Sequence, residues 1–130
     1  MEILQPPGWP RPKGYSNGVA ASGRMVFVSG MVGWNAAGVF ESDDFAVQVR
    51  QALLNIVDVL AEAAARPEHI VRMTWYVVDR EEYLAAQQAI GTAYRAVIGR
   101  HFPAMSAMAV AGLMEPRARV EIEATAVIPS

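Results

Sequence analysis

The sequence predicts an α+β protein in which one mixed β-sheet carries two helices on the same face. Two long segments, 43–65 and 80–98, repeat apolar residues at three- and four-residue spacing, which is typical of amphipathic helices. Shorter segments rich in β-branched and aromatic residues surround them and predict strands. The expected order is β-β-α-β-α-β-β, and two similar helices suit one face of a single sheet. The predicted strands are 18–21, 25–29, 70–78, 105–111 and 119–128.

Composition narrows the class of protein. The chain has 130 residues, of which 53% are apolar and 18% charged, so we expect one globular domain. A net charge of -2 gives no basic surface for a nucleic acid, and nucleic acid is therefore not an expected partner. No cysteine is present, which excludes disulfides and thiolate catalysis and suits a cytoplasmic protein. The first residues do not resemble a signal peptide, and no apolar run is long enough to predict a membrane span.

The N-terminal third predicts an arm, a hairpin and a loop. Residues 1–13 are rich in proline and predict an extended arm in which Trp9 needs a packing partner, and residues 14–130 form the single domain. The strands 18–21 and 25–29 flank Ser22-Gly23, which predicts a hairpin turn. Residues 30–38 form a glycine-spaced loop that lacks the lysine and hydroxyl residue of a phosphate loop and matches no dinucleotide motif.

Capping residues predict where the helices begin. Ser42 is the expected N-cap of the first helix, which we expect to run through Ala65 and to end at Arg66-Pro67. Asp79, with Glu82 three residues later, predicts the start of a single second helix that ends at Gly99.

The last predicted strand has one apolar and one charged face. Val120, Ile122 and Ala124 alternate with the charged set Arg119, Glu121 and Glu123, so the apolar set should lie under the helices. The other strands are apolar on both faces, although helices are available for only one. We therefore expect the second face to be buried against other copies of the chain, in a homo-oligomer.

Six blocks of sequence follow one another along residues 14–126. They are Gly14-Tyr15-Ser16-Asn17-Gly18-Val19, Val26-Phe27-Val28-Ser29-Gly30, Arg50-Gln51-Ala52-Leu53-Leu54-Asn55-Ile56, Glu68-His69-Ile70-Val71-Arg72-Met73-Thr74, Phe102-Pro103-Ala104 and Val120-Glu121-Ile122-Glu123-Ala124. In this order the blocks resemble the RidA/YjgF/UK114 family, a family also called endoribonuclease L-PSP. The resemblance implies a chorismate-mutase-like fold assembled as a homotrimer with a central β-barrel and three clefts between subunits. It also implies hydrolysis of reactive enamines or imines to a keto compound and ammonia, with no metal or organic cofactor.

The resemblance implies roles for individual residues. Glu121 matches the acid that positions or activates water, Tyr15 matches the cleft tyrosine, and Ser29 precedes the loop glycine Gly30. Ser106 ends the block in which the family carries Pro-Ala-Arg-Ser, where the arginine grips the substrate carboxylate.

In this chain Met105 occupies the arginine position. A charge-assisted bidentate pair contributes about 1.5 to 3 kcal/mol, so its loss should weaken binding of a small 2-imino acid by roughly 10- to 150-fold. Efficient processing of 2-aminoacrylate is therefore not expected. Met105 and Met31 predict a more apolar cleft that favours a larger or less acidic ligand, and an aminomuconate-type compound is one candidate.

Several alternatives stay open at this stage. Glu121 is either the cleft acid or a hydrogen-bonding residue of the subunit interface, and Tyr15 either lines the cleft or packs. Arg119 is either a salt-bridge partner of Glu121 or Glu123 or a clamp for the ligand. The other arginines considered as replacements are Arg117 and Arg24. The two histidines have no suitably spaced partners, and no metal site is predicted.

Three functions remain, and the first is favoured. The first is a hydrolytic deaminase of an enamine, imine or related conjugated amine, with water attack assisted by Glu121. The second is a non-catalytic trimer that binds a small metabolite in the intersubunit cleft. The third, an endoribonuclease, fits poorly with the acidic charge.

Overall fold

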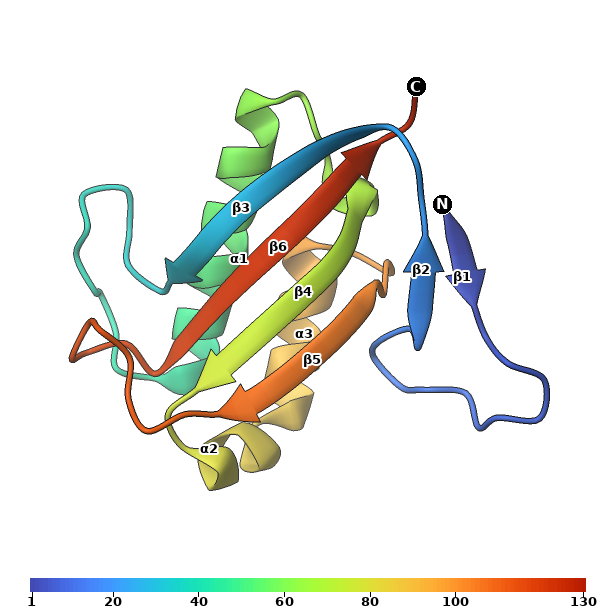
Figure 1. Ribbon diagram of the computed structural model, residues 1–130. Helices are drawn as coiled ribbons and strands as arrows, with labels where there is room; N and C mark the ends of the chain where they lie inside the picture. The colour runs from blue at the N-terminus through green and yellow to red at the C-terminus, as the bar shows by residue number, and fades with distance from the viewer.

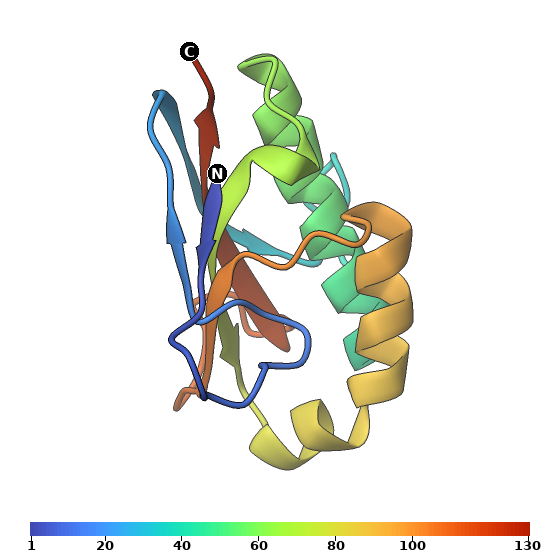
Figure 2. The same cartoon turned by 90° about the vertical axis from the view of Figure 1, so that its right-hand side faces the viewer.

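A computed structural model describes residues 1–130, the whole chain. A four-stranded sheet lies against helices on one side only, and a two-stranded sheet lies beside its edge (Figures 1 and 2). The elements in chain order are β1 (Glu2–Leu4), β2 (Gly18–Ala20), β3 (Arg24–Val32), α1 (Phe45–Glu62), the 3-10 helix η1 (Pro67–His69), β4 (Ile70–Val77), α2 (Arg80–Ala85), α3 (Gln87–Val97), β5 (Ala104–Ala109) and β6 (Val120–Ile128).

The main sheet has the strand order β3-β6-β4-β5. β6 pairs antiparallel with both of its neighbours, whereas β4 and β5 are parallel. Parallel neighbours need a long crossover connection, and α2 with α3 provides it. The predicted α+β class and the mixed sheet with its helices on one face are confirmed. β3 and β5 form the two opposite edges of this sheet.

Alternation along β6 places the core. Val120, Ile122, Ala124 and Ala126 are buried beneath the helices, as the period-two pattern predicted. On α1 the buried residues recur at helical spacing, and Leu53, Ile56 and Leu60 are fully buried against the sheet. Burial of each such side chain stabilises the fold by about 1.5 to 3 kcal/mol. The helix-covered face of the sheet is therefore the hydrophobic core.

The helices α1 and α2 each begin at an aspartate cap. Asp44, and not Ser42, is the N-cap of α1, because its carboxylate accepts from the Val47 N–H. Ser42 instead accepts from the Asp44 N–H one turn earlier in the loop. Asp79 caps α2 as predicted.

The helices end earlier than the sequence pattern suggested. α1 stops at Glu62, and Ala64 adopts a left-handed backbone with φ of 59°. The predicted second helix is interrupted at Ala86, whose φ of -100° and ψ of 14° separate α2 from α3. Alanine gives no sequence signal for such a break. After this turn α3 packs along α1.

The N-terminal segment is not simply an extended arm. Glu2–Leu4 pairs with Gly18–Ala20 to form the two-stranded β1-β2 sheet. The predicted hairpin around Ser22-Gly23 is therefore wrong, because β2 pairs with β1 while β3 joins the main sheet. Trp9, expected to need a packing partner, is 59% exposed.

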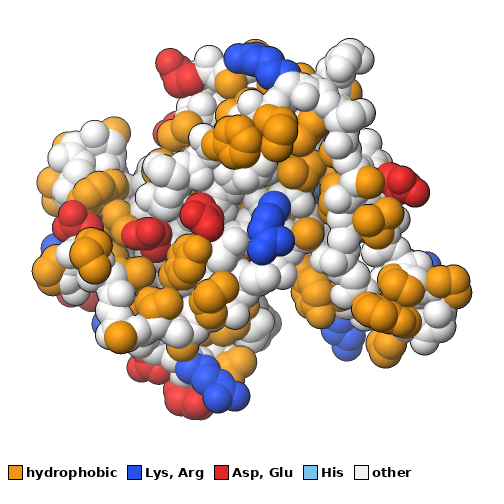
Figure 3. Space-filling model, in the orientation of Figure 1, with side chains coloured by type: hydrophobic (Ala, Val, Ile, Leu, Met, Phe, Trp, Pro, Cys, Tyr) orange, Lys and Arg blue, Asp and Glu red, His pale blue; other side chains and the backbone are white.

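The sheet face opposite the helices is open (Figures 2 and 3). Phe27 is 70% exposed there, and Met25 and Met108 also remain exposed. Apolar side chains lie on this face among charged ones, as Figure 3 shows from that side. None of the helices has both the length and the apolar character that a membrane crossing requires. The open face is thus a surface that the fold leaves uncovered.

Candidate functional site

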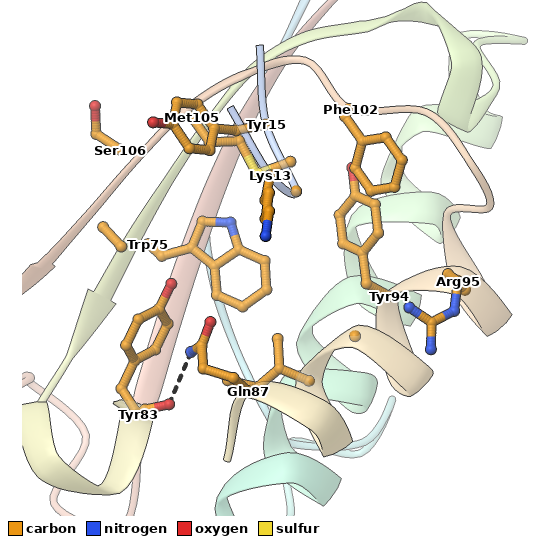
Figure 4. Close-up of a pocket in the computed structure, with 14 residues that line it drawn as sticks. Lys13, Tyr15, Trp75, Tyr83, Gln87, Tyr94, Arg95, Phe102, Met105 and Ser106 are labelled. Atoms are coloured by element: carbon orange, nitrogen blue, oxygen red, sulfur yellow. Dashed lines mark hydrogen bonds between the residues drawn. The ribbon is translucent and has the colours of Figure 1, made fainter. Parts of the chain in front are cut away.

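A cavity of about 670 Å³ lies between α3 and the β5 side of the sheet (Figure 4). Its volume falls within the range of small-molecule sites, roughly 300 to 1,000 Å³. Eight of its 14 lining residues are hydrophobic, and none is acidic. They are Lys13, Gly14, Tyr15, Trp75, Tyr83, Gln87, Ile90, Gly91, Tyr94, Arg95, Phe102, Met105, Ser106 and Ala107.

The chain before β2 forms one wall of this cavity. The Ser16 N–H donates to the Pro103 carbonyl at 3.0 Å, and the Ser16 hydroxyl donates to the Phe102 carbonyl. These bonds attach the segment to the chain entering β5, where residue 16 forms an isolated parallel bridge with Ala104. Gly14 has φ of 79°, a left-handed conformation that glycine adopts without strain. The bend and the anchor together place Tyr15 at the cavity.

Met105 and Ser106 also line this cavity. Met105 pairs in register with Met73 and packs against the core, so its side chain lies on the helix-covered face of β5. Figure 4 shows it beside Tyr15, whereas the Ser106 side chain points away from the centre. Three of the predicted site residues, Tyr15, Met105 and Ser106, are therefore brought together.

Aromatic rings form much of the remaining lining. The Tyr94 and Phe102 rings stack with centroids 5.6 Å apart and an interplanar angle of 13°. The Tyr94 hydroxyl donates to the His101 carbonyl, and burial raises the pKa of Tyr94 above its ordinary value. Tyr94 is thus a neutral wall residue and not a proton donor for chemistry near neutral pH.

A second group of predicted site residues lies on β3 and β6. A Cβ placed on Gly30 would stand 2.3 Å from the Glu121 Oε2, so the carboxylate rests directly on this glycine. Ser29 and Gly30 occupy an irregular part of β3, where the pairing with β6 shifts between Val28 and Met31. Such bulges re-aim side chains next to functional sites. Glu121, Ser29 and Gly30 are therefore brought together.

Met31 does not join either group as a free cleft residue. It pairs in register with Ile122 and packs against the hydrophobic core. The sequence could not place it, because the irregular pairing of β3 changes which residues face the helices.

The two groups cannot meet within one chain. Glu121 shares a row of the sheet with Tyr76 and Met108, whereas Met105 shares a row with the buried Met73. Glu121 and Met105 are two strands apart, about 10 Å, and about 10 Å apart along the strands. They also lie on opposite faces of the sheet. A single active site that uses both needs two copies of the chain.

The arginines considered as replacements for the missing one are engaged elsewhere. The Arg119 Nε donates to both carboxylate oxygens of Glu82 on α2, at 2.7 and 2.9 Å. The expected pairing of Arg119 with Glu121 or Glu123 is therefore wrong, and the hydrogen bond to Glu82 raises the pKa of Arg119.

Arg117 binds Asp43 at 2.8 Å and the Phe40 carbonyl, and Arg24 donates to the Ala63 carbonyl. None of the three arginines lines the cavity.

Glu123 has a structural partner. It accepts a hydrogen bond from the Tyr76 hydroxyl at 2.9 Å, and this bond raises the pKa of Tyr76. No group of three or more histidine, aspartate or glutamate side chains is placed to hold a metal ion.

The cavity contains cations that sequence reasoning missed. Lys13 and Arg95 both line it, from the N-terminal segment and from α3. Lys13 precedes the first family block, and Arg95 lies on a helix whose polar face looked solvated, so neither carried a local signal. Trp75, assigned only to a strand, also lines the cavity.

The fold and the cavity define a class of small α+β proteins with a one-sided sheet and a site at its β5 edge. The family described as Endoribonuclease L-PSP matches residues 10–128, and the chain belongs to this family, which includes the RidA/YjgF proteins. The resemblance seen in the sequence is thereby confirmed.

Known relatives and structures agree with this membership. The chain is 30% identical to a RutC family protein from Synechocystis, over 100% of this chain and 98% of that protein. It is 32% identical to the 2-iminobutanoate/2-iminopropanoate deaminase of Escherichia coli K12, over 81% of this chain and 80% of that enzyme. The crystal structure of the conserved Rid family protein YyfB from Yersinia pestis is similar with a TM-score of 0.86, at 33% identity and covering 98% of both chains.

Proposed function

We propose that the protein is a hydrolytic deaminase of a reactive enamine, imine or related conjugated amine, acting as a homotrimer. The observation that carries the proposal is the division of the site between opposite edges of one sheet. Tyr15, Met105 and Ser106 line the cavity at the β5 edge, and Glu121 rests on Gly30 beside the β3 edge. A head-to-tail ring brings the β5 edge of one subunit to the β3 edge of the next and closes after a fixed number of copies.

The open sheet face supports assembly. Phe27, Met25 and Met108 are exposed there, and exposed apolar side chains on a sheet face without helices support a protein interface. Assembly through these strands covers the face that no helix protects. The expected trimer places three equivalent clefts around a barrel of strands.

Glu121 is the proposed base for the addition of water. It takes a proton from water while the water oxygen bonds to the imine carbon and the nitrogen gains a proton. The hydroxyl proton of the resulting amino alcohol passes to the nitrogen, the C–N bond breaks, and ammonia leaves as the C=O bond forms. An enamine first gains a proton on carbon to become the imine. General base catalysis of such a step contributes about 10²- to 10⁴-fold.

The other residues position the substrate. Tyr15 offers a hydroxyl at the cavity wall, and Ser29, Gly30 and Ser106 offer polar groups near the two halves of the cleft. Met105 provides an apolar contact where the family's arginine binds carboxylate, and the proposed substrate is therefore larger or less acidic than 2-aminoacrylate. The deaminase name of the Escherichia coli relative supports the reaction class and not this particular substrate.

The decisive experiment compares two glutamates on the same face of β6. Glu121→Gln should lower ammonia release from a panel of oxidase-generated imines and aminomuconate-type compounds by about 100-fold or more. Glu123→Gln is the matched control, because Glu123 already accepts from the Tyr76 hydroxyl. Analytical ultracentrifugation of both variants should give the trimer mass.

Three results would contradict the proposal. Full activity of Glu121→Gln removes the proposed base, and a monomeric mass removes the shared cleft. Absence of ammonia release from every compound in the panel removes the reaction itself.

A non-catalytic trimer that binds a small metabolite is the second candidate, and Met105 is the observation that favours it. Without the arginine, the cavity keeps its aromatic walls but loses the anchor that holds a small imino acid over the water. Ligand-induced thermal stabilisation without turnover would support this function. RNA cleavage is not proposed, because the net charge is -2.

A further inference from the structure

The indole of Trp75 carries the one buried side-chain polar atom in the chain that lacks a hydrogen-bond partner. Its Nε1 is fully buried and has no acceptor within the chain, and Trp75 as a whole is 4% exposed. Buried indole N–H groups ordinarily find an acceptor, because leaving a buried donor unpaired costs free energy. Trp75 lines the cavity, and Figure 4 shows its nitrogen on the side of the ring that faces Lys13.

Lys13 brings a positive charge to the same cavity. It is the single lysine of the chain, and it takes part in none of the three ion pairs. Both residues line the cavity, and Figure 4 shows the Lys13 side chain pointing towards the Trp75 ring. The anchor of Ser16 on the Pro103 carbonyl fixes the segment that carries it.

The rest of the lining selects against cations and favours flat groups. No aspartate or glutamate lines the cavity, and Arg95 adds a second positive charge at its α3 side. The stacked Tyr94 and Phe102 rings and the Tyr83 ring offer apolar faces. A carboxylate satisfies both an unpaired N–H donor and an ammonium group, and a conjugated body suits aromatic walls.

We propose that this cavity binds a planar aromatic or conjugated monocarboxylate, whose carboxylate accepts from Trp75 Nε1–H and pairs with the Lys13 ammonium group. The inference rests on the proposed function only in naming the substrate class of that cavity. Trp75 on β4 and Lys13 on the N-terminal segment would thus hold the carboxylate that the family's arginine holds from β5, where this chain has Met105. The cavity volume of about 670 Å³ admits a ring and its substituents.

Benzoate and benzamide are suitable probes, because they share shape but differ in charge. The chain has three tryptophans, so its proton–nitrogen NMR spectrum contains three indole signals, and Trp75→Phe assigns one of them. Benzoate should shift the Trp75 indole signal to lower field and leave the other two unmoved. It should also bind at least about 5-fold more tightly than benzamide, since only benzoate forms a charged pair with Lys13.

Lysine variants separate the local pair from general electrostatics. Lys13→Met should weaken benzoate binding by about 3- to 10-fold and leave benzamide binding unchanged, and Lys13→Arg should restore most of the affinity. Arg11→Met is the matched control, because it removes the same charge from the same segment but does not line the cavity. The comparison of benzoate with benzamide in the wild-type protein needs no variant, so the proposal stays falsifiable even if Trp75→Phe folds poorly.

Three results would overturn the site. They are an unmoved Trp75 indole signal, benzamide binding as tight as benzoate binding, and equal losses in Lys13→Met and Arg11→Met. The titration involves no turnover and is therefore independent of the deaminase proposal. If benzoate binds as described but no imine releases ammonia, the carboxylate site stands and the reaction fails; ammonia release without benzoate binding gives the reverse conclusion.

Discussion

Restoring the missing arginine tests how far Met105 sets the substrate. Met105 is half-buried and lines the cavity next to Tyr15, so an arginine at this position points its guanidinium into the same space. A bidentate contact with a carboxylate stabilises binding by about 1.5 to 3 kcal/mol. Repulsion from Lys13 and Arg95 in a partly solvated cavity opposes this by on the order of 1 kcal/mol. The net gain is about 0.5 to 2 kcal/mol, or roughly a 2- to 30-fold rise in kcat/KM for a small 2-imino acid.

The assay follows ammonia release from 2-iminopropanoate generated continuously by an amino-acid oxidase, corrected for uncatalysed hydrolysis. Met114→Arg is the matched control, because Met114 is 92% exposed in the loop before β6 and lies outside the cavity. An unchanged kcat/KM in a folded Met105→Arg protein would refute the reasoning. An equal rise in Met114→Arg would attribute the gain to overall charge and not to the cavity.

Three further predictions concern positioning and stability. Gly30→Ala places a Cβ about where the Glu121 carboxylate now rests, and should lower ammonia release by roughly 10- to 100-fold with little loss of stability, since a flexible side chain gives way. Arg119→Met breaks the half-exposed pair with Glu82 and should lower the free energy of unfolding in urea by about 1 kcal/mol with activity retained. Burial raises the pKa of Tyr94, so the folded state keeps a proton that the unfolded state releases above about pH 10. The free energy of unfolding therefore keeps its full value below that pH and falls above it by about 1 kcal/mol per pH unit. Tyr94→Phe should remove this alkaline loss of stability.

Each of these has its own check. Gly112→Ala is the control for Gly30→Ala, because a Cβ at Gly112 meets nothing within 4 Å. Equal losses of ammonia release in both variants would show that displacement of Glu121 is not the cause. Loss of ammonia release in a stable Arg119→Met protein would contradict this prediction and indicate that Arg119 binds the ligand. For Tyr94, equal alkaline slopes in chemical denaturation of the variant and the wild type would contradict the burial argument.

The sequence was sufficient wherever the signal was local. The alternation along β6 placed Ile122 in the core, because a strand turns successive side chains to opposite faces. Asp79 marked the start of α2, since a carboxylate before a helix satisfies its free N–H groups. The family blocks indicated the fold before any contact was known, and the substitution at Met105 was visible in the sequence itself.

Tertiary structure decided the pairings between distant residues. Arg119 binds Glu82 and not its neighbours on β6, because the crossover brings α2 against the end of that strand. The buried Gln48 donates to the Ser42 and Arg117 carbonyls and accepts from the Arg119 N–H. Its position along α1 does not predict these contacts.

The division of the site has the same origin. Glu121 and Met105 lie 16 positions apart in the sequence and on opposite faces of the sheet, a separation that strand order and register alone determine. The sequence by itself determined the fold class and the chemical types available for a site. Only the tertiary structure decided that Lys13 and Trp75 share a cavity, because contacts between distant residues depend on how the elements pack and leave no periodic signal in the chain.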